Sequence, residues 1–355
     1  MRLPKANKKL AEKYATGLSQ FKDKTAKIKL SANESALGPS PKAIKEYLKL
    51  SKNFKRYPDS GGVNLRKSLA NKFKLDPNRI ILGSGSDQIL ELVCKTFLKK
   101  GDEVVVPKYS FLIYRLYSQM NGAKILYSKE KNFTVSVDDI LKKVTKKTKI
   151  VFLANPNNPT STYIDKKKLL FLRKRLRSNI LLVVDDAYFE YVKQKDYSSG
   201  LQLFSNFKNV VVTRTFSKIY GLAGLRVGWG YGSKEIINSL NQVKPPFNIN
   251  SPALSAAEAA IKDNAWLNKE IKHVKKWSDI FYKEFKKLNI ETNKSFTNFL
   301  LINFDKVKKN SSKIFNLLAN AGILVRKMNS YGIKNSLRVT IGKNNENKKL
   351  ILKLK

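Results

Sequence analysis

Short apolar runs alternate with amphipathic stretches between residues 80 and 230. Seven runs rich in aliphatic residues predict strands, over 79–82, 103–107, 124–127, 149–154, 180–184, 210–214 and 227–231. Between these runs, apolar residues recur at helical spacing. Strands that alternate with helices predict an α/β fold, in which a mostly parallel seven-stranded sheet lies between helices.

The residues after each predicted strand show where chemistry is to be expected. Six of the runs, from 79–82 to 210–214, lead into polar or glycine-rich residues. In open parallel sheets, ligands bind at the carboxyl edge, where these segments meet. Candidate site residues are therefore sought directly after the strands.

The pattern changes after Lys244-Pro245-Pro246. Long charged helices are predicted over 253–287, and short strands follow around 299–304, 323–326 and 336–341. We expect a large domain over 31–246 and a smaller α+β domain over 247–355. The N-terminal arm, 1–30, is expected to pack on the small domain.

Composition narrows the function classes. The chain has 70 Lys and Arg against 27 Asp and Glu, a formal charge of +43. The lysines are spread over nearly every predicted helix, so we expect adhesion to polyanions at low salt but no specific nucleic-acid site. No apolar run reaches the roughly 20 residues of a membrane span, which favours a soluble cytoplasmic protein. With a single cysteine, Cys94, and a single histidine, His273, expected at the surface, neither a metal site nor a histidine triad is favoured.

The strand at 210–214 is followed by hydroxyl residues, a lysine, glycines and an arginine. Lys218 is placed to form an imine with an aldehyde cofactor and to carry protons. Thr215, Ser217 and Arg226 are donors suited to a phosphate group. Taken alone, a lysine in so basic a chain is more often solvated.

The run 181–184 ends in an acid pair. Asp185 is the candidate for pairing with a protonated pyridine nitrogen, while Asp186 is interpreted as structural. Tyr188 lies within reach of a cofactor ring hydroxyl. Magnesium sites and helix caps produce similar patterns, so the acid alone is weak support.

Two further strand ends carry polar residues. The segment Ala154-Asn-Pro-Asn-Asn-Pro-Thr160 is a loop restricted by prolines that presents Asn158, although in isolation a simple turn is the better explanation. Gly85, Ser86 and Asp87 open a helix whose amide groups suit a phosphate. The dinucleotide fingerprint is incomplete there, because a third glycine is missing.

These four segments, in this order, resemble the fold-type I aminotransferases that depend on pyridoxal 5′-phosphate (PLP), and within them most closely the histidinol-phosphate aminotransferases. The resemblance extends from Leu30-Ser-Ala-Asn-Glu34 to Leu337-Arg-Val-Thr-Ile-Gly342. It implies that Lys218 carries the cofactor as a Schiff base, that Asp185 pairs with the pyridine, and that Asn158 and Tyr188 bind the ring oxygen. The implied phosphate ligands are Gly85, Ser86, Thr215, Ser217 and Arg226.

The resemblance also implies residues at the substrate end and between subunits. Phe111, or as second choice Tyr109, is expected to stack on the cofactor ring. Arg338 and Arg326 are expected to bind the substrate's anionic groups, with Asn33 at the substrate entrance. Tyr57 matches a tyrosine that reaches the neighbouring subunit's cofactor, which implies a homodimer.

The chain departs from the family pattern twice, at Ser161 and in Asn33-Glu-Ser-Ala36. The implied reaction is transamination between histidinol phosphate and 2-oxoglutarate in histidine biosynthesis. Three alternatives stay open: an aromatic or other 2-amino-acid aminotransferase, a PLP lyase or decarboxylase of a phosphorylated amino acid, and a nucleic-acid-binding protein on a silent enzyme scaffold.

Overall fold

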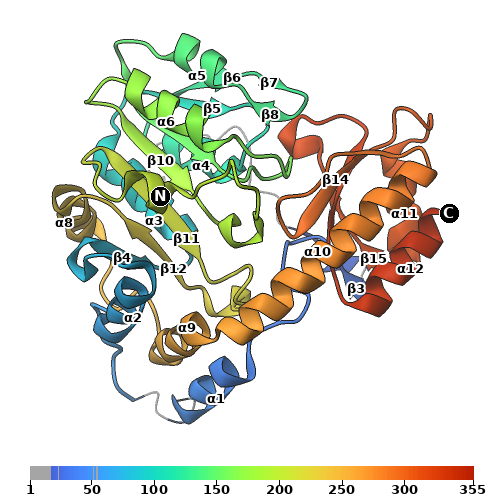
Figure 1. The fold of residues 1–355 in the computed structure, drawn as a ribbon, viewed down its shortest axis with the longest axis horizontal. Coiled ribbons are helices and arrows are strands. Elements are labelled where there is room, and N and C mark those ends of the chain that lie inside the picture. Colours follow the sequence, from blue (N-terminus) through green and yellow to red (C-terminus); the bar gives the residue numbers. More distant parts are fainter. Residues whose placement is uncertain (1–16, 23, 51, 53–54) are drawn as a thin grey trace, which may run out of the picture.

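The computed structural model describes residues 17–22, 24–50, 52 and 55–355. Within them, a seven-stranded sheet has the order β4-β12-β11-β10-β9-β5-β6 (Figure 1). Its strands are β4 (Ile80–Gly83), β5 (Glu103–Pro107), β6 (Lys124–Ser128), β9 (Thr148–Ala154), β10 (Leu181–Asp185), β11 (Val210–Thr215) and β12 (Gly228–Tyr231). Only β12 runs antiparallel to its neighbours. The predicted α/β fold with a mostly parallel sheet is confirmed.

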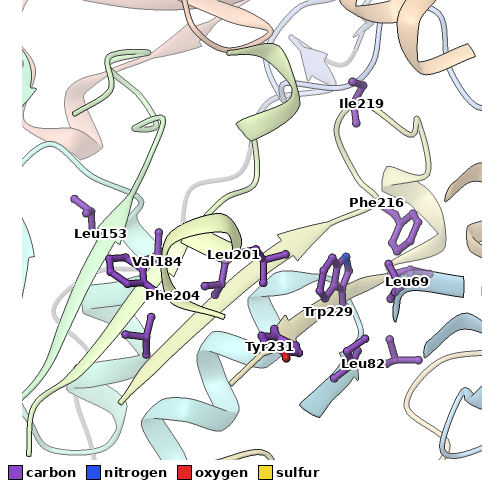
Figure 2. Close-up of a cluster of buried hydrophobic side chains, with 14 of the residues drawn as sticks. Leu69, Leu82, Leu153, Val184, Leu201, Phe204, Phe216, Ile219, Trp229 and Tyr231 are labelled. Atoms are coloured by element: carbon purple, nitrogen blue, oxygen red, sulfur yellow. The ribbon is translucent and has the colours of Figure 1, made fainter. Parts of the chain in front are cut away.

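Helices cover both faces of this sheet because its strands are apolar on both sides. The helices of this part of the chain are α1 (Pro41–Leu50), α2 (Val63–Phe73), α3 (Ser86–Phe97), α4 (Leu112–Met120), α5 (Val137–Lys143), α6 (Lys166–Arg175), α7 (Gly200–Phe204), α8 (Lys234–Val243) and α9 (Ser251–Lys262), of which α1 packs on α9. On one face, Val184 packs with Leu201 and Phe204 in the cluster of Figure 2. On the other face, Val183 packs with Tyr114. Successive residues of β10 thus enter two separate cores.

The long helix α10 (Asn264–Lys287) leads away from this sheet to a second, smaller layered unit (Figure 1). There a four-stranded sheet has the order β13-β14-β17-β16. Its elements are β13 (Glu291–Thr292), β14 (Phe299–Asn303), β16 (Arg326–Lys327), β17 (Ser336–Thr340), α11 (Ser311–Asn320) and α12 (Asn344–Leu354). The domain boundary at residue 246 stays a prediction, since Ala253, Ala257 and Leu267, which come after it, pack into the core of the first sheet.

The described part of the N-terminal segment lies against the smaller unit. Strand β3 (Ile28–Lys29) pairs in parallel with β15 (Ile323–Leu324), and Leu30 is buried in the hydrophobic core of the smaller unit. The first part of the predicted arm, residues 1–16, lies outside the described residues. The single strand predicted over 323–326 is divided at Val325, because β15 pairs with β3 whereas β16 pairs with β17.

Short elements complete the described chain: β1 (Gln20–Phe21), β2 (Lys24–Thr25), β7 (Glu130–Lys131), β8 (Thr134–Val135) and the 3₁₀ helices η1 (Pro77–Arg79), η2 (Phe189–Tyr191), η3 (Ala223–Leu225) and η4 (Asn329–Tyr331). Among the described residues, no helix is both long and apolar enough to cross a bilayer.

The surface position predicted for His273 is wrong: the ring is partly buried and its Nε2 lies 2.9 Å from the Gly342 carbonyl oxygen.

Candidate active site

A cavity of about 400 Å³ opens where β9, β10 and β11 end. Its walls come from the large sheet, from the segment around residues 17–34 and from the strands β16 and β17. Most of the predicted site residues line it: Asn33, Ser86, Asp87, Phe111, Asn158, Asp185, Tyr188, Thr215, Ser217, Lys218, Arg226, Arg326 and Arg338. The carboxyl edge of the sheet is therefore a concave surface that gathers residues from distant parts of the chain.

Lys218 lies three residues beyond the end of β11, in a loop that turns back before β12. Burial lowers the pKa of its ammonium to about 8, and the nearby Arg338 guanidinium adds to this effect. The Nζ atom is 5.9 Å from the centre of the Tyr188 ring. A lysine with this pKa has a sizeable fraction of free amine near neutral pH, which a nucleophile or proton carrier requires.

Asp185, the last residue of β10, is buried, with 5 % of its surface exposed. Burial raises the pKa of its carboxyl to about 6, although the hydrogen bond from Tyr114 opposes this. The Tyr114 hydroxyl donates to Asp185 Oδ2 at 2.7 Å, and the tyrosine ring stacks on Phe152 at 4.9 Å between centroids. The carboxylate is held by a neutral donor, and no cation is paired with it among the described residues.

One end of the cavity forms a cup of amide, hydroxyl and guanidinium groups. Arg226 NH1 donates to Ser217 Oγ at 3.2 Å, and the Ser217 backbone amide donates to Thr215 Oγ1 at 3.0 Å. Arg226 NH2 is 3.4 Å from Asp87 Oδ2. Burial raises the pKa of the Asp87 carboxyl while Arg226 opposes that rise.

Glycines bring the backbone of this cup close together. Gly85 precedes α3 with a φ of +77°, and a Cβ atom there would lie 2.4 Å from Arg226 NH2. Gly228 of β12 touches the same turn, since a Cβ atom there would lie 2.2 Å from the Ser86 amide nitrogen. The amino end of α3 is thus open toward the arginine, in the arrangement that binds phosphate groups.

The opposite end joins the two structural units through hydrogen bonds. Arg338 NH1 donates to Asn158 Oδ1 at 2.7 Å, and Asn33 Nδ2 donates to the Tyr188 hydroxyl oxygen at 2.9 Å. Burial raises the pKa of the Tyr188 hydroxyl well above its ordinary value, so it stays protonated. These bonds orient Asn158 and Tyr188 from the side of the smaller sheet.

Arg326 and Arg338 lie opposite each other in the antiparallel pair β16·β17, and both are buried. Arg326 also lies over the ring of Tyr331, 5.7 Å from its centroid. Two buried guanidinium groups on neighbouring strands present several donors to the same cavity. Such a pair suits an anion with several oxygens.

Three predicted residues lie outside the cavity wall. Gly85 lies behind it, as described above. Tyr109 packs instead against Phe133, 5.9 Å between centroids, while Phe111 faces the cavity. Tyr57 is 81 % exposed and stacks on Phe247 at 4.5 Å, so it has no contact with the cavity of its own chain.

Sequence reasoning missed Tyr114, Lys29 and Glu34, all of which line the cavity. Tyr114 is on the inward face of an amphipathic helix and looks like an ordinary core residue. Lys29 and Glu34 form an ion pair at 2.7 Å, but in so basic a chain neither stands out. The sequence feature that could have indicated Lys29 and Glu34 is their position near Asn33, on the segment predicted to reach the substrate entrance.

Comparison with known proteins agrees with this geometry. The family model described as "Aminotransferase class I and II" matches residues 25–354. A histidinol-phosphate aminotransferase of Pelagibacter ubique (strain HTCC1062) is 52% identical, with 100% of this chain and 99% of the relative covered. A second one, from Rhodopseudomonas palustris (strain BisB18), is 42% identical over 95% of this chain and 93% of its own.

Solved structures show the same fold. The histidinol-phosphate aminotransferase of Sinorhizobium meliloti, in complex with pyridoxal-5′-phosphate, superposes with a TM-score of 0.87, 22% identity, and coverage of 93% of this chain and 90% of that one. The enzyme from Clostridium acetobutylicum gives a TM-score of 0.84 at 25% identity, covering 92% and 97%. The buried lysine, the buried carboxylate and the cup of donors thus stand on a fold that such enzymes share, and the chain belongs to the class I and II aminotransferases.

Proposed function

We propose that the protein is a PLP-dependent transaminase that moves the amino group of histidinol phosphate to 2-oxoglutarate, giving imidazole acetol phosphate and glutamate. The observation that carries this proposal is that Lys218, with its lowered pKa, and the buried carboxylate of Asp185 line one cavity. Strongly shifted groups of opposite charge in one cleft are typical of active sites.

The donor set fits PLP. The donors of the cup suit a phosphate group; they come from Ser86, Thr215, Ser217 and Arg226. Because Gly85 has no side chain, none projects from that position into the cup beside Arg226. Asp185 matches the pyridinium nitrogen, whose positive charge would balance the buried carboxylate. When bound, PLP supplies an electron sink that makes the proton on the substrate's amino-bearing carbon acidic.

The chain's own residues would then act as follows. Lys218 would hold the cofactor covalently and, once released, move a proton with Nζ. The Tyr188 hydroxyl accepts from Asn33, so its own proton remains available to a ring oxygen. Asn158 Oδ1 accepts from Arg338, which leaves the Asn158 amide nitrogen as a second donor. Phe111 would lie against the ring, since it lines the cavity where Tyr109 does not.

The substrate is proposed from the arginines and from the relatives. Arg326 and Arg338 would bind the phosphate of histidinol phosphate. The two histidinol-phosphate aminotransferases reported above, at 52% and 42% identity over nearly the whole chain, favour this donor over aromatic amino acids and over a lyase or decarboxylase reaction. The complete set of site residues argues against a silent scaffold that binds nucleic acid.

We further propose a cytoplasmic homodimer in which Tyr57 completes the neighbouring subunit's phosphate cup. Its exposure and its stacking on Phe247 support this arrangement, because an aromatic residue held rigidly at the surface is suited to an interface. A division into a large domain over 31–246 and a small domain over 247–355 is supported by the separate hydrophobic core of the smaller sheet, although Ala253, Ala257 and Leu267 pack with the large sheet. Sedimentation of the active protein as a monomer would contradict the shared site.

The absorption spectrum tests the proposed reaction. We expect purified protein with PLP to show the visible band of a lysine-bound cofactor, to lose it with histidinol phosphate, and to regain it with 2-oxoglutarate. A response to phenylalanine alone would retain the chemistry and change the substrate. The Lys218→Ala variant should bind PLP without the band and without turnover, and undiminished turnover would refute the assignment.

A further inference from the structure

We propose that the ion pair Lys29–Glu34 binds the end of each substrate that is remote from the amino group. Glu34 accepts a hydrogen bond from the imidazole N–H of histidinol phosphate, and Lys29 binds the distal carboxylate of 2-oxoglutarate and glutamate. This inference rests on the proposed function, because it concerns two substrates that must occupy one cavity in turn. The two differ in charge at the end remote from the amino group, so a single fixed group cannot suit both.

The charged groups of the cavity lead to this pair by elimination. Asp185 is placed for the pyridinium, and Asp87 lies beside Arg226 in the phosphate cup. Arg326 and Arg338 oppose each other on β16 and β17. Glu34 is the remaining carboxylate on the wall, and Lys29 is the remaining cation apart from Lys218.

The two substrates share one half. Histidinol phosphate carries a phosphate-bearing arm on its amino carbon, and glutamate carries a carboxylate there. Both anions fit the arginine pair. What is left is an imidazole ring on one substrate and a carboxylate on the other. An imidazole offers an N–H donor that a glutamate accepts, whereas a carboxylate needs a cation.

The side chains of this ion pair are exposed enough to turn toward a ligand, while the backbone beneath Glu34 is held in place. Lys29 Nζ is 2.7 Å from Glu34 Oε1, with the side chains 33% and 42% exposed. At that exposure the attraction contributes little to stability, so either member can turn to a ligand at small cost. The backbone beneath is fixed, because Asn298 Nδ2 donates to the carbonyl oxygens of Asn33 and Glu34 at 3.0 and 3.1 Å.

The pair also faces the reaction centre. Asn33, which directly precedes Glu34, donates to the Tyr188 hydroxyl oxygen beside Lys218. The charge of Glu34 is among the groups that raise the pKa of Lys218, which places the carboxylate within electrostatic reach of that amine. A substrate bound at Lys218 would therefore extend its far end toward Lys29 and Glu34.

Separate half-reactions test the inference. Each half-reaction is followed by the cofactor band at rising concentrations of one substrate, which gives an apparent Kd for that substrate alone. We expect Glu34→Gln to raise the apparent Kd of histidinol phosphate about tenfold, as for the loss of a hydrogen bond to a charged group. The same variant should leave or lower the apparent Kd of 2-oxoglutarate, since Lys29 is released from its partner.

Lys29→Met should show the opposite selectivity. We expect the apparent Kd of 2-oxoglutarate and glutamate to rise about tenfold while that of histidinol phosphate changes less than about twofold. The matched controls are Glu258→Gln and Lys262→Met, which break an ion pair of equal 2.7 Å length on α9, away from the cavity wall. They correct for the loss of one charge from a very basic protein.

The outcomes separate this inference from the function on which it rests. If wild-type protein does not react with histidinol phosphate, the proposed function fails. If wild type reacts normally but each variant changes the apparent Kd of both substrates equally, or of neither, the proposed role of Lys29 and Glu34 is overturned. A loss of the lysine-bound cofactor band would point to a damaged site, and the unreacted spectrum of each variant detects this.

Discussion

The two acids that end β10 are neighbours in sequence and buried to nearly the same degree, but they face opposite sides of the sheet. Asp185 continues the face of Val183 and meets the Tyr114 hydroxyl in the cavity. Asp186 continues the face of Val184, on the side shown in Figure 2. It accepts from the Gly200 amide at 2.9 Å and lies 3.5 Å from Arg214.

The partners, rather than the burial, distinguish the two acids. Burial raises the pKa of both to about 6. Asp186 has a cation of its own, because Arg214 is buried over the ring of Phe189, 3.4 Å from its centroid. Asp185 has neutral donors only, the Tyr114 hydroxyl and the Ala187 amide. A paired buried carboxylate belongs to the structure, whereas an uncompensated one is ready for a ligand's positive charge.

The largest expected effect is on turnover. Replacing Asp185 by Asn should lower kcat by about 10³-fold, because a group that stabilises developing charge is lost. The folded state should be as stable as wild type or more so, since an uncompensated buried charge is removed. Kinetics and thermal unfolding of the cofactor-free protein measure both. A marked loss of stability would make Asp185 structural.

Asp186→Asn is the matched change on the other face. It leaves the Arg214 guanidinium buried without its nearest counter-ion, so we expect a loss of about 3 kcal/mol in the free energy of unfolding. Turnover per folded, PLP-loaded molecule should change little. Denaturant unfolding checks the first statement and active-site titration the second. If the stability of the two variants fell equally, the contrast between the acids would be false.

The pH dependence of stability comes next in size. Because the pKa of Asp185 is raised from 3.8 to about 6 in the folded state, the fold binds this proton more tightly than the unfolded chain. Stability should therefore fall as pH rises through that window, by about 3 kcal/mol for this group. The comparison is between cofactor-free wild type and Asp185→Asn, which cannot titrate. A constant difference between pH 4 and about 6 would contradict the raised pKa.

Tyr114→Phe should have the smallest effect of the four. Without the donated hydrogen bond, the Asp185 carboxylate is less stable and its pKa rises further. The acid limb of PLP binding should move to higher pH, with about tenfold weaker binding near pH 6. Fluorescence titration with PLP across pH 5–8 measures this. Tyr191→Phe is the control, because the buried Tyr191 hydroxyl has no hydrogen-bond partner among the described residues.

Local order along the chain determined much of this protein. Alternating strands and helices predicted the sheet, and the residues after the strands predicted Lys218, Asp185, Asn158 and Thr215 as neighbours. They meet because the carboxyl ends of parallel strands share one edge. The exception is β12, which runs in the opposite direction in the sheet. The sheet and its shared edge depend on the spacing of apolar residues and on the order of strands and helices along the chain, and a sequence carries both by itself.

Tertiary structure alone decided which side chains face each other. Nothing in the sequence indicated that Tyr114 would reach Asp185 or that Arg338 would bond to Asn158. It also decided between Phe111 and Tyr109 for the cavity wall. Periodicity tells which face of an element is buried, but contacts between distant elements depend on how helices and sheets dock, and that docking is a property of the whole packed core.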